Sequence, residues 1–175
     1  MTPPPARKDS IDRFIESSLD RFPGVDPETE GIVDRIHKIS KHVNRLTERT
    51  VTRFGLNAGE FHTLLKLRVA PDQQATAGDL AELLDLSTGA MTNRLDGLEE
   101  RGLITRQRAV SDRRSVVVSL TTKGEDILVQ TVESVAKEED AVISTLSDPQ
   151  RRRLTELLRA VSVGIEERRD ASSET

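Results

Sequence analysis

The sequence predicts a mainly α-helical fold that carries one small β-hairpin. Apolar residues recur three and four positions apart through most of the chain, which is the period of a helix with one buried face. After Gly102 this period gives way to two short runs typical of strands. With 35% hydrophobic, 2% aromatic and 32% charged residues, the composition suits helices with solvated faces better than a chain enclosing a large apolar pocket. At 175 residues the chain is long enough to bury a core.

Several protein classes are excluded by composition. No run of eighteen apolar residues is present, so we expect no membrane span. The first eight residues, Met1 to Lys8, lack the apolar stretch of a signal peptide, and we expect a cytoplasmic protein. Because the chain has no cysteine, it has no disulfide, no thiolate zinc site and no thiol redox sensor. No cluster of histidines and carboxylates predicts a metal site, and no cofactor motif is present.

Residues 1–8 are rich in proline, and we predict a disordered tail. Residues 9–55 are expected to form two helices. The first is short and amphipathic, ends near Phe22-Pro23-Gly24, and carries Ile11, Phe14, Ile15 and Leu19 at helical spacing. The second is long, ends near Gly55, and has a heptad-like apolar seam made of Ile32, Ile36, Ile39, Val43 and Leu46.

The C-terminal part, residues 123–175, is predicted to hold two further helices and a tail. The helices span about Lys123–Leu146 and Asp148–Glu167, with Pro149 in the first turn of the second and Ser147 or Asp148 as its cap. Long helices with one apolar stripe at both ends of a chain commonly pair with a second copy, so we expect them to be dimerisation helices. Bundling within one chain is the alternative.

The residues between these helical ends, 56–122, contain the most informative pattern. A helix over about Ala58–Val69 is followed by Thr76-Ala77-Gly78-Asp79, which resembles a capping box and opens a second helix. A break at Asp85-Leu86-Ser87 comes next, with Ser87 as the cap of a third helix. That helix has one apolar face, made of Met91, Leu95 and Leu98. Two short helices joined by a tight turn are typical of a helix-turn-helix.

The exposed face of the helix that Ser87 caps favours DNA binding. Its small and hydrogen-bonding residues allow a close approach to the major groove, and its N-terminal amides suit a phosphate. Arg94 suits either the groove or the DNA backbone. The expected contacts on this helix come from Ser87, Thr88, Thr92, Asn93 and Arg94.

The two strand-like runs, Leu103–Arg108 and Val116–Leu120, predict a hairpin joined directly to the helix-turn-helix, which makes a wing. An arginine at the tip of such a wing can enter a narrow minor groove. The segment 87–115 has six arginines against four acidic residues, so it is net positive within a chain of charge −4. Taken alone, this charge count favours a solvated surface over a DNA-binding one.

Together these motifs resemble the MarR family of winged helix-turn-helix regulators over roughly Ile32 to Ile165. The run from Leu86 to Leu95 is similar to the family's recognition helix. Asp112-Arg113-Arg114 followed by Leu120-Thr121-Thr122-Lys123-Gly124 is similar to its wing. The resemblance implies a homodimer on a pseudopalindromic double-stranded DNA operator, with Thr88, Thr92 and Asn93 near the bases. It also implies Arg114 in the minor groove, Asp112 orienting Arg114, and Arg113 on phosphate. The alternative for Asp112 and Arg114 is a pair that only stiffens the hairpin.

The extra N-terminal helix resembles the PecS-like, urate-responsive branch of this family. That branch has a tryptophan on the extra helix, where this chain has Ser18 and no tryptophan anywhere, and His62 stands in place of an acidic ligand residue. Urate is therefore not carried over. The resemblance implies a small aromatic or phenolic effector, for which His62 is the candidate ligand. A histidine packed at a helix interface is the alternative.

These observations predict a ligand-responsive DNA-binding transcriptional regulator, most often a repressor in this family. No nucleophile elbow, phosphate loop or metal signature is present, so we do not expect an enzyme. A winged helix used only for protein contacts is the other hypothesis. Such a module would more often expose aromatic residues or leucines on the face that here carries Thr88 to Asn93.

Overall fold

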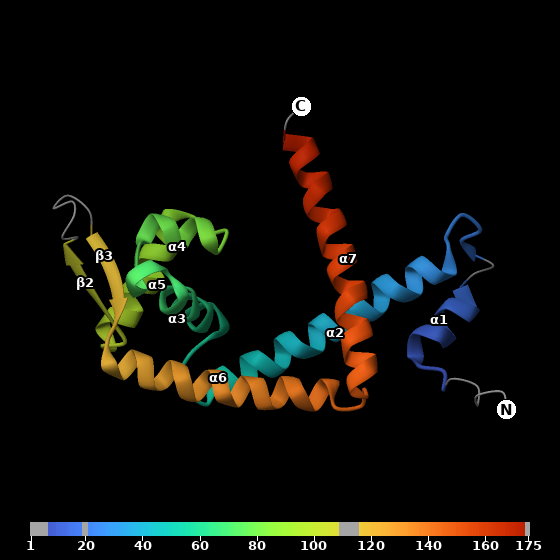
Figure 1. The fold of residues 1–175 in the computed structure, drawn as a ribbon, viewed down its shortest axis with the longest axis horizontal. Coiled ribbons are helices and arrows are strands. Elements are labelled where there is room, and N and C mark those ends of the chain that lie inside the picture. The colour runs from blue at the N-terminus through green and yellow to red at the C-terminus, as the bar shows by residue number, and fades with distance from the viewer. Residues whose placement is uncertain (1–6, 19–20, 109–115, 174–175) are drawn as a thin grey trace. The chain divides into compact units, whose positions relative to one another are not determined.

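The computed structural model describes residues 7–18, 21–108 and 116–173 (Figure 1). The chain divides into two compact units, Met1–Thr131 and Val132–Thr175, and the boundary falls inside α6. Within the described residues, no helix is long and apolar enough to cross a membrane. The helices are α1 (Ser10–Ser18), α2 (Pro27–Thr52), α3 (Ala58–Val69), α4 (Ala77–Leu83), α5 (Thr88–Glu100), α6 (Thr122–Ile143) and α7 (Asp148–Ser173), with a 3₁₀ turn, η2 (Pro71–Gln73). The strands are β1 (Gln74–Thr76), β2 (Ile104–Arg108) and β3 (Val116–Leu120).

A small sheet lies beside α3, α4 and α5 in the first unit (Figure 1). Strands β2 and β3 form the predicted hairpin, with Ile104 opposite Leu120 and Arg108 opposite Val116. A third strand, β1, pairs antiparallel with the other edge of β3, which gives the order β1-β3-β2. The mainly α fold with a β-hairpin wing is thus confirmed, and β1 is an addition to it. Three residues are too few to show strand periodicity, which is why the sequence did not indicate β1.

Local capping signals placed the helix starts of this unit correctly. In the Thr76–Asp79 capping box, the Asp79 amide donates to Thr76 Oγ1 and the Thr76 amide donates to Asp79 Oδ2. That second hydrogen bond lowers the pKa of Asp79, since it favours the carboxylate form. Ser87 caps α5 by accepting from the Ala90 amide at 3.2 Å. In the second unit, α7 begins at Asp148, so Pro149 is its second residue and Ser147 precedes it.

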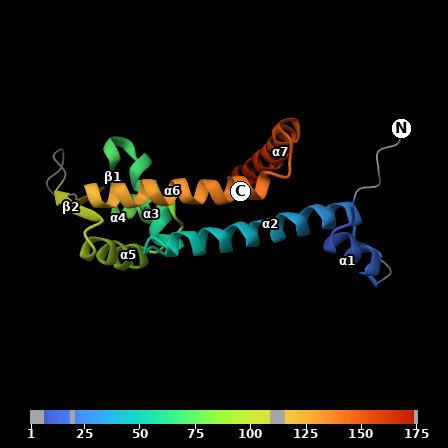
Figure 2. The same ribbon diagram turned by 90° about the horizontal axis from the view of Figure 1, so that it is seen from below.

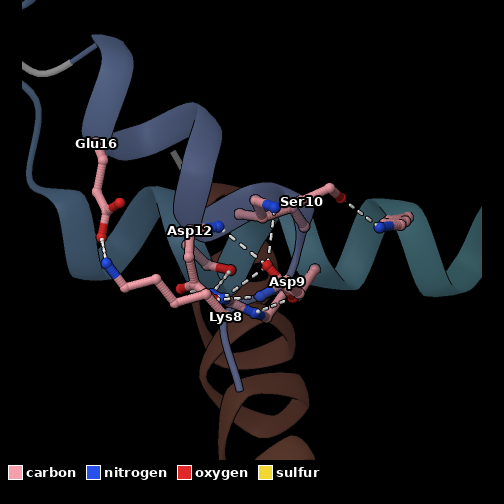
Figure 3. A network of polar contacts seen from close by, with 9 residues as sticks. Lys8, Asp9, Ser10, Asp12 and Glu16 are labelled. Carbon is pink, nitrogen blue, oxygen red and sulfur yellow. Dashed lines mark hydrogen bonds and ion pairs between the residues drawn. The ribbon is translucent and has the colours of Figure 1, made fainter. Parts of the chain in front are cut away.

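Helix α1 is held against α2 by a cluster of charged side chains (Figure 3). The guanidinium of Arg35 donates to both carboxylate oxygens of Asp9, at 3.1 and 3.2 Å, and to Asp12 at 2.5 Å. Lys38 donates to Ser10 Oγ at 2.6 Å. Between the two helices Ile11 is buried, so the contact has an apolar part as well. The predicted N-terminal helix is therefore a docked element of the first unit.

Two helices leave apolar stripes exposed. On α2, Ile32, Ile36 and Ile39 are 40–53% exposed, whereas Leu46 at the other end of the same seam is buried. On α7, the exposed apolar residues are Leu154, Leu157, Leu158, Val161, Val163 and Ile165. The α2 stripe lies in the first unit and the α7 stripe lies in the second. Neither is covered by the described residues of its own unit, so a second copy of the chain remains the predicted partner.

Candidate nucleic-acid interface

Helix α5 has one face buried in the lobe and the opposite face open. Met91, Leu95 and Leu98 are completely buried, as their spacing predicted. The side chains of Thr88, Thr92 and Asn93 are exposed. Figure 2 shows α5 along one side of the lobe. A helix that reads a DNA groove requires one apolar face that packs on the lobe and an opposite face with short polar side chains.

The open face of α5 carries only small side chains near the start of the helix. A Cβ added at Gly89 would meet no atom within 4 Å. Thr92 Oγ1 donates to the Thr88 carbonyl at 2.9 Å, so its hydroxyl is held against the backbone of its own helix. Ser87 uses its hydroxyl as a cap, so its oxygen is engaged at the helix start. The exposed edge therefore presents Thr88, Gly89, Thr92 and Asn93 with little bulk.

Arg94 turns toward the lobe. Its Nη1 donates to the Gly59 carbonyl at 3.1 Å and to Thr63 Oγ1 at 3.2 Å, both on α3. Gly59 makes room for it, because a Cβ there would lie 2.8 Å from Arg94 Nη2. In this position Arg94 holds α5 against α3. A DNA contact by Arg94 stays a prediction, and the packing role is what its contacts favour.

Two other arginines of the basic segment have acidic partners. Arg106 of β2 pairs through Nη1 with Asp96 and Glu99 of α5, each at 2.7 Å. Arg101 pairs with Glu60 at 2.7 Å and donates to the Gly55 carbonyl at 2.6 Å. The net charge of the segment therefore overstates the number of cations available to DNA. The sequence shows that Asp96 and Glu99 are three residues apart and so share one helix face. It does not show that Arg106 of β2 lies beside them.

The start of α6 closes the wing onto the end of α5. Thr121 Oγ1 donates to the Gly102 carbonyl at 2.7 Å and accepts from the Gly124 amide at 3.0 Å. The Thr121 amide donates to the Leu103 carbonyl at 3.1 Å, and Lys123 Nζ donates to the Arg101 carbonyl at 2.7 Å. Gly124 packs so closely that a Cβ would lie 1.9 Å from the Leu103 oxygen. The Leu-Thr-Thr-Lys-Gly run thus has a structural reason for its spacing.

The predicted wing-tip residues Asp112, Arg113 and Arg114 lie outside the described residues, between the end of β2 and the start of β3. Arg108, the last residue of β2, is exposed. The roles of the three tip residues stay predictions.

His62, the candidate effector ligand, is exposed on α3. Its ring centroid lies 5.6 Å from that of Phe61, with an interplanar angle of 46°. The ring is therefore not packed inside the helix interface that was the alternative reading. Binding of an effector by His62 stays a prediction.

Comparison with known proteins gives matches over this same region and beyond it. A family model described as MarR family matches residues 56–116, which run from the connection between α2 and α3 to the first residue of β3. The HTH-type transcriptional regulator PecS of Dickeya dadantii is 26% identical over 154 residues, covering 87% of this chain and 93% of PecS. The HTH-type transcriptional regulator MhqR of Bacillus subtilis is 30% identical over 125 residues, covering 71% of this chain and 82% of MhqR.

Among solved structures, a mutant MarR of Escherichia coli complexed with operator DNA is similar, with a TM-score of 0.61 and 26% identity. The match covers 88% of this chain and 99% of that one. Wild-type MarR of the same organism, in its apo form, gives a TM-score of 0.64 with 28% identity over 73% of this chain. The similarity therefore includes the helices that flank the lobe as well as the lobe itself.

Proposed function

Because the chain belongs to the MarR family, we propose that it is a DNA-binding transcriptional regulator that reads an operator with the open face of α5. The observation that carries this proposal is the pairing of a completely buried apolar face with an exposed edge of Thr88, Thr92 and Asn93 on one helix. The relative solved with operator DNA supports the same assignment. Homodimerisation through α2 and α7, a pseudopalindromic operator and repression are parts of the same proposal.

A mobility-shift titration on the DNA upstream of the protein's own gene tests the reading face. We expect Asn93→Ala and Thr92→Ala to weaken specific binding by about 1–3 kcal/mol each, the range of a lost base contact. Thr52→Ala is the matched control, because Thr52 is an exposed helical threonine with the same hydrogen bond to the carbonyl four residues earlier. Equal affinity of Thr92→Ala, Asn93→Ala and Thr52→Ala would remove α5 as the reader.

The wing needs a separate variant. We propose that Arg114 enters the minor groove, that Asp112 orients it, and that Arg113 meets a phosphate. Arg114→Ala is expected to weaken binding more than Arg152→Ala, which removes an equally charged, exposed side chain of α7. Undiminished binding by Arg114→Ala would contradict the wing role. Binding should also weaken steeply as salt rises, since phosphate contacts release counterions.

A protein-contact module is the second candidate function. It keeps the winged lobe without sequence-specific DNA binding, and the polar character of the α5 edge disfavours it. Absence of any specific shift by the wild-type protein, across a panel of its upstream fragments, would favour it.

We also propose that a small aromatic or phenolic effector changes operator affinity, with His62 among its ligands. A thermal-shift measurement with salicylate as a simple phenolic probe, on wild type and His62→Ala, tests this assignment. We expect a smaller shift for the variant, because its imidazole no longer offers a hydrogen bond. Identical shifts in both proteins would remove His62 from the site.

A further inference from the structure

A cavity of about 230 Å³ lies between α1 and the N-terminal end of α2, both in the first unit. It is distant in sequence from the α5 edge and from His62, and nothing in the proposed DNA-reading role uses it. Its walls are largely apolar, and two carboxylates complete them. The lining residues are Phe14, Ile15, Phe22, Val25, Pro27, Glu30 and Asp34.

Aromatic rings are concentrated at this cavity. The chain has four phenylalanines and neither tryptophan nor tyrosine. Phe14 and Phe22 line the cavity and are 61% and 59% exposed, whereas Phe61 is buried in the lobe. Exposing two of four rings at one place leaves apolar area in water that a bound molecule would cover.

The carboxylates of the cavity are not neutralised within the described residues. Glu30 and Asp34 are four residues apart on α2, so they lie on one helix face. Neither has a hydrogen bond or ion pair to a side chain that the structure describes. The neighbouring acids at the start of α1 differ, because Asp9, which precedes the helix, and Asp12 both pair with Arg35. The cavity therefore combines apolar walls with unpaired negative charge.

Its shape is set in advance by the charged cluster beside it. Arg35, one residue after Asp34, holds α1 in place through Asp9 and Asp12, and Figure 3 shows these two acids on the side of α1 that meets α2. A ligand entering the cavity would not have to order α1 first, which lowers the entropic cost of binding.

We propose that this cavity binds a small hydrophobic cation, such as an aromatic or quaternary amine. A cationic head between Glu30 and Asp34 would be stabilised by Coulomb attraction strengthened by the apolar walls. The faces of Phe14 and Phe22 would add cation–π attraction and cover the organic part of the ligand. A neutral ring would satisfy only the apolar walls, and an anion would be repelled by both acids.

Isothermal titration calorimetry of the full chain with benzyltrimethylammonium tests the proposal, with benzyl alcohol as the neutral ring and benzoate as the anion. We expect the cation to bind once per chain and more tightly than benzyl alcohol, and benzoate not to bind. The double variant Glu30→Gln, Asp34→Asn should weaken cation binding at least about tenfold, which is about 1.4 kcal/mol. Phe22→Ala should weaken it by about threefold or more.

Glu28→Gln is the matched control, because it removes the same charge from the same helix without lining the cavity. We expect its affinity for the cation to stay within about twofold of wild type. Equal binding of cation and neutral ring, or an unchanged affinity in the double variant, would overturn the proposal.

A second copy of the chain is the competing occupant. Its signature would be no cation binding by wild type together with a lower mass of Phe14→Ala or Phe22→Ala in light scattering, and this result would also overturn the proposal. Since the titrations contain no DNA, their outcome is independent of the mobility-shift tests of operator binding.

Discussion

Gly124 shows how a single added atom, a Cβ, would prevent the start of α6 from packing against Leu103. A Cβ at this position would lie 1.9 Å from the Leu103 carbonyl oxygen and 2.9 Å from its carbon, which are backbone atoms that cannot turn away. The same residue donates its amide to Thr121 Oγ1, so a displaced backbone would lose that hydrogen bond too. The close approach of α6 to the residues that follow α5 therefore depends on the missing side chain.

Gly124→Ala is expected to destabilise the protein by about 1–3 kcal/mol or more through overpacking. Gly97→Ala is the control, since a Cβ there meets nothing within 4 Å and alanine favours the helix by up to about 1 kcal/mol. Urea unfolding followed by circular dichroism measures both changes. A Gly124→Ala protein as stable as wild type would contradict the contact.

Asp9 offers a test of the cluster that holds α1. Its pKa is lowered from 3.8 to about 2, chiefly by the hydrogen bond from the Asp12 amide and further by the Ile11 amide and Arg35. Because the folded pKa lies below the ordinary value, the stabilising effect is complete above about pH 4 and is lost as the pH falls toward 2.

We therefore expect a carbon-13 NMR titration to give Asp9 a pKa near 2 in wild type. In Arg35→Gln this pKa should rise only part of the way to its ordinary value, since the amide hydrogen bonds remain. A complete return to the ordinary value would show that Arg35, and not the backbone, lowers it.

At the scale of the elements, the turn between α4 and α5 contains a residue in an unfavourable backbone conformation. Asp85 has a φ of 52°, and the Leu86 amide donates to the Ala81 carbonyl at 2.9 Å, which is the closing bond of a Schellman-type helix end. The equivalent residue after α5 is Gly102, with a φ of 67°. The helix-turn-helix thus places an aspartate where glycine is preferred.

Asp85→Gly should raise the free energy of unfolding by about 0.5–1 kcal/mol, because glycine adopts this φ without a Cβ clash. Asp85→Ala keeps the clash and removes the polar side chain that eases it, so it should be less stable than Asp85→Gly. The urea midpoint of each variant, at unchanged slope, measures the difference. An alanine variant more stable than the glycine variant would contradict the role given to φ.

At the scale of the whole molecule, the exposed stripes of α2 and α7 bear on oligomeric state. Ile32, Ile36 and Ile39 on one helix, and Leu157, Val161 and Ile165 on the other, expose apolar area that a stable dimer would bury. We expect light scattering at micromolar concentration to report about twice the 19.4 kDa chain mass.

Ile36→Asp and Val161→Asp should each shift the protein toward the monomer, because a carboxylate in an apolar interface is costly to desolvate. Val69→Asp is the control, since Val69 is an exposed valine of α3 that belongs to neither stripe. A monomeric wild-type protein would overturn the dimer proposal, and dimers of all three variants would remove α2 and α7 from the interface.

The sequence by itself determined the features that depend on near neighbours in the chain. The extent of α3, the capping box at Thr76, the cap at Ser87 and the buried face of α5 follow from interactions over three or four residues. Such features can be predicted without knowing the fold, because both interacting residues lie within about one turn of the same helix. A change from helical to strand-like period predicted the hairpin, and the resemblance of the motifs to known regulators indicated the family that the comparisons support.

Tertiary structure alone decided the partners of Arg94 and Arg35. Arg94 has its partners on α3, 35 and 31 residues away, and Arg35 reaches Asp9 across 26 residues. Strand β1 forms because β3 has a free edge beside it, and the cavity of Phe14 and Phe22 forms because α1 folds back onto α2. The spacing of apolar residues along the sequence indicates which face of a helix or strand is apolar. Which distant segment meets that face, and which cations are thereby paired, depends on packing between elements far apart in the sequence.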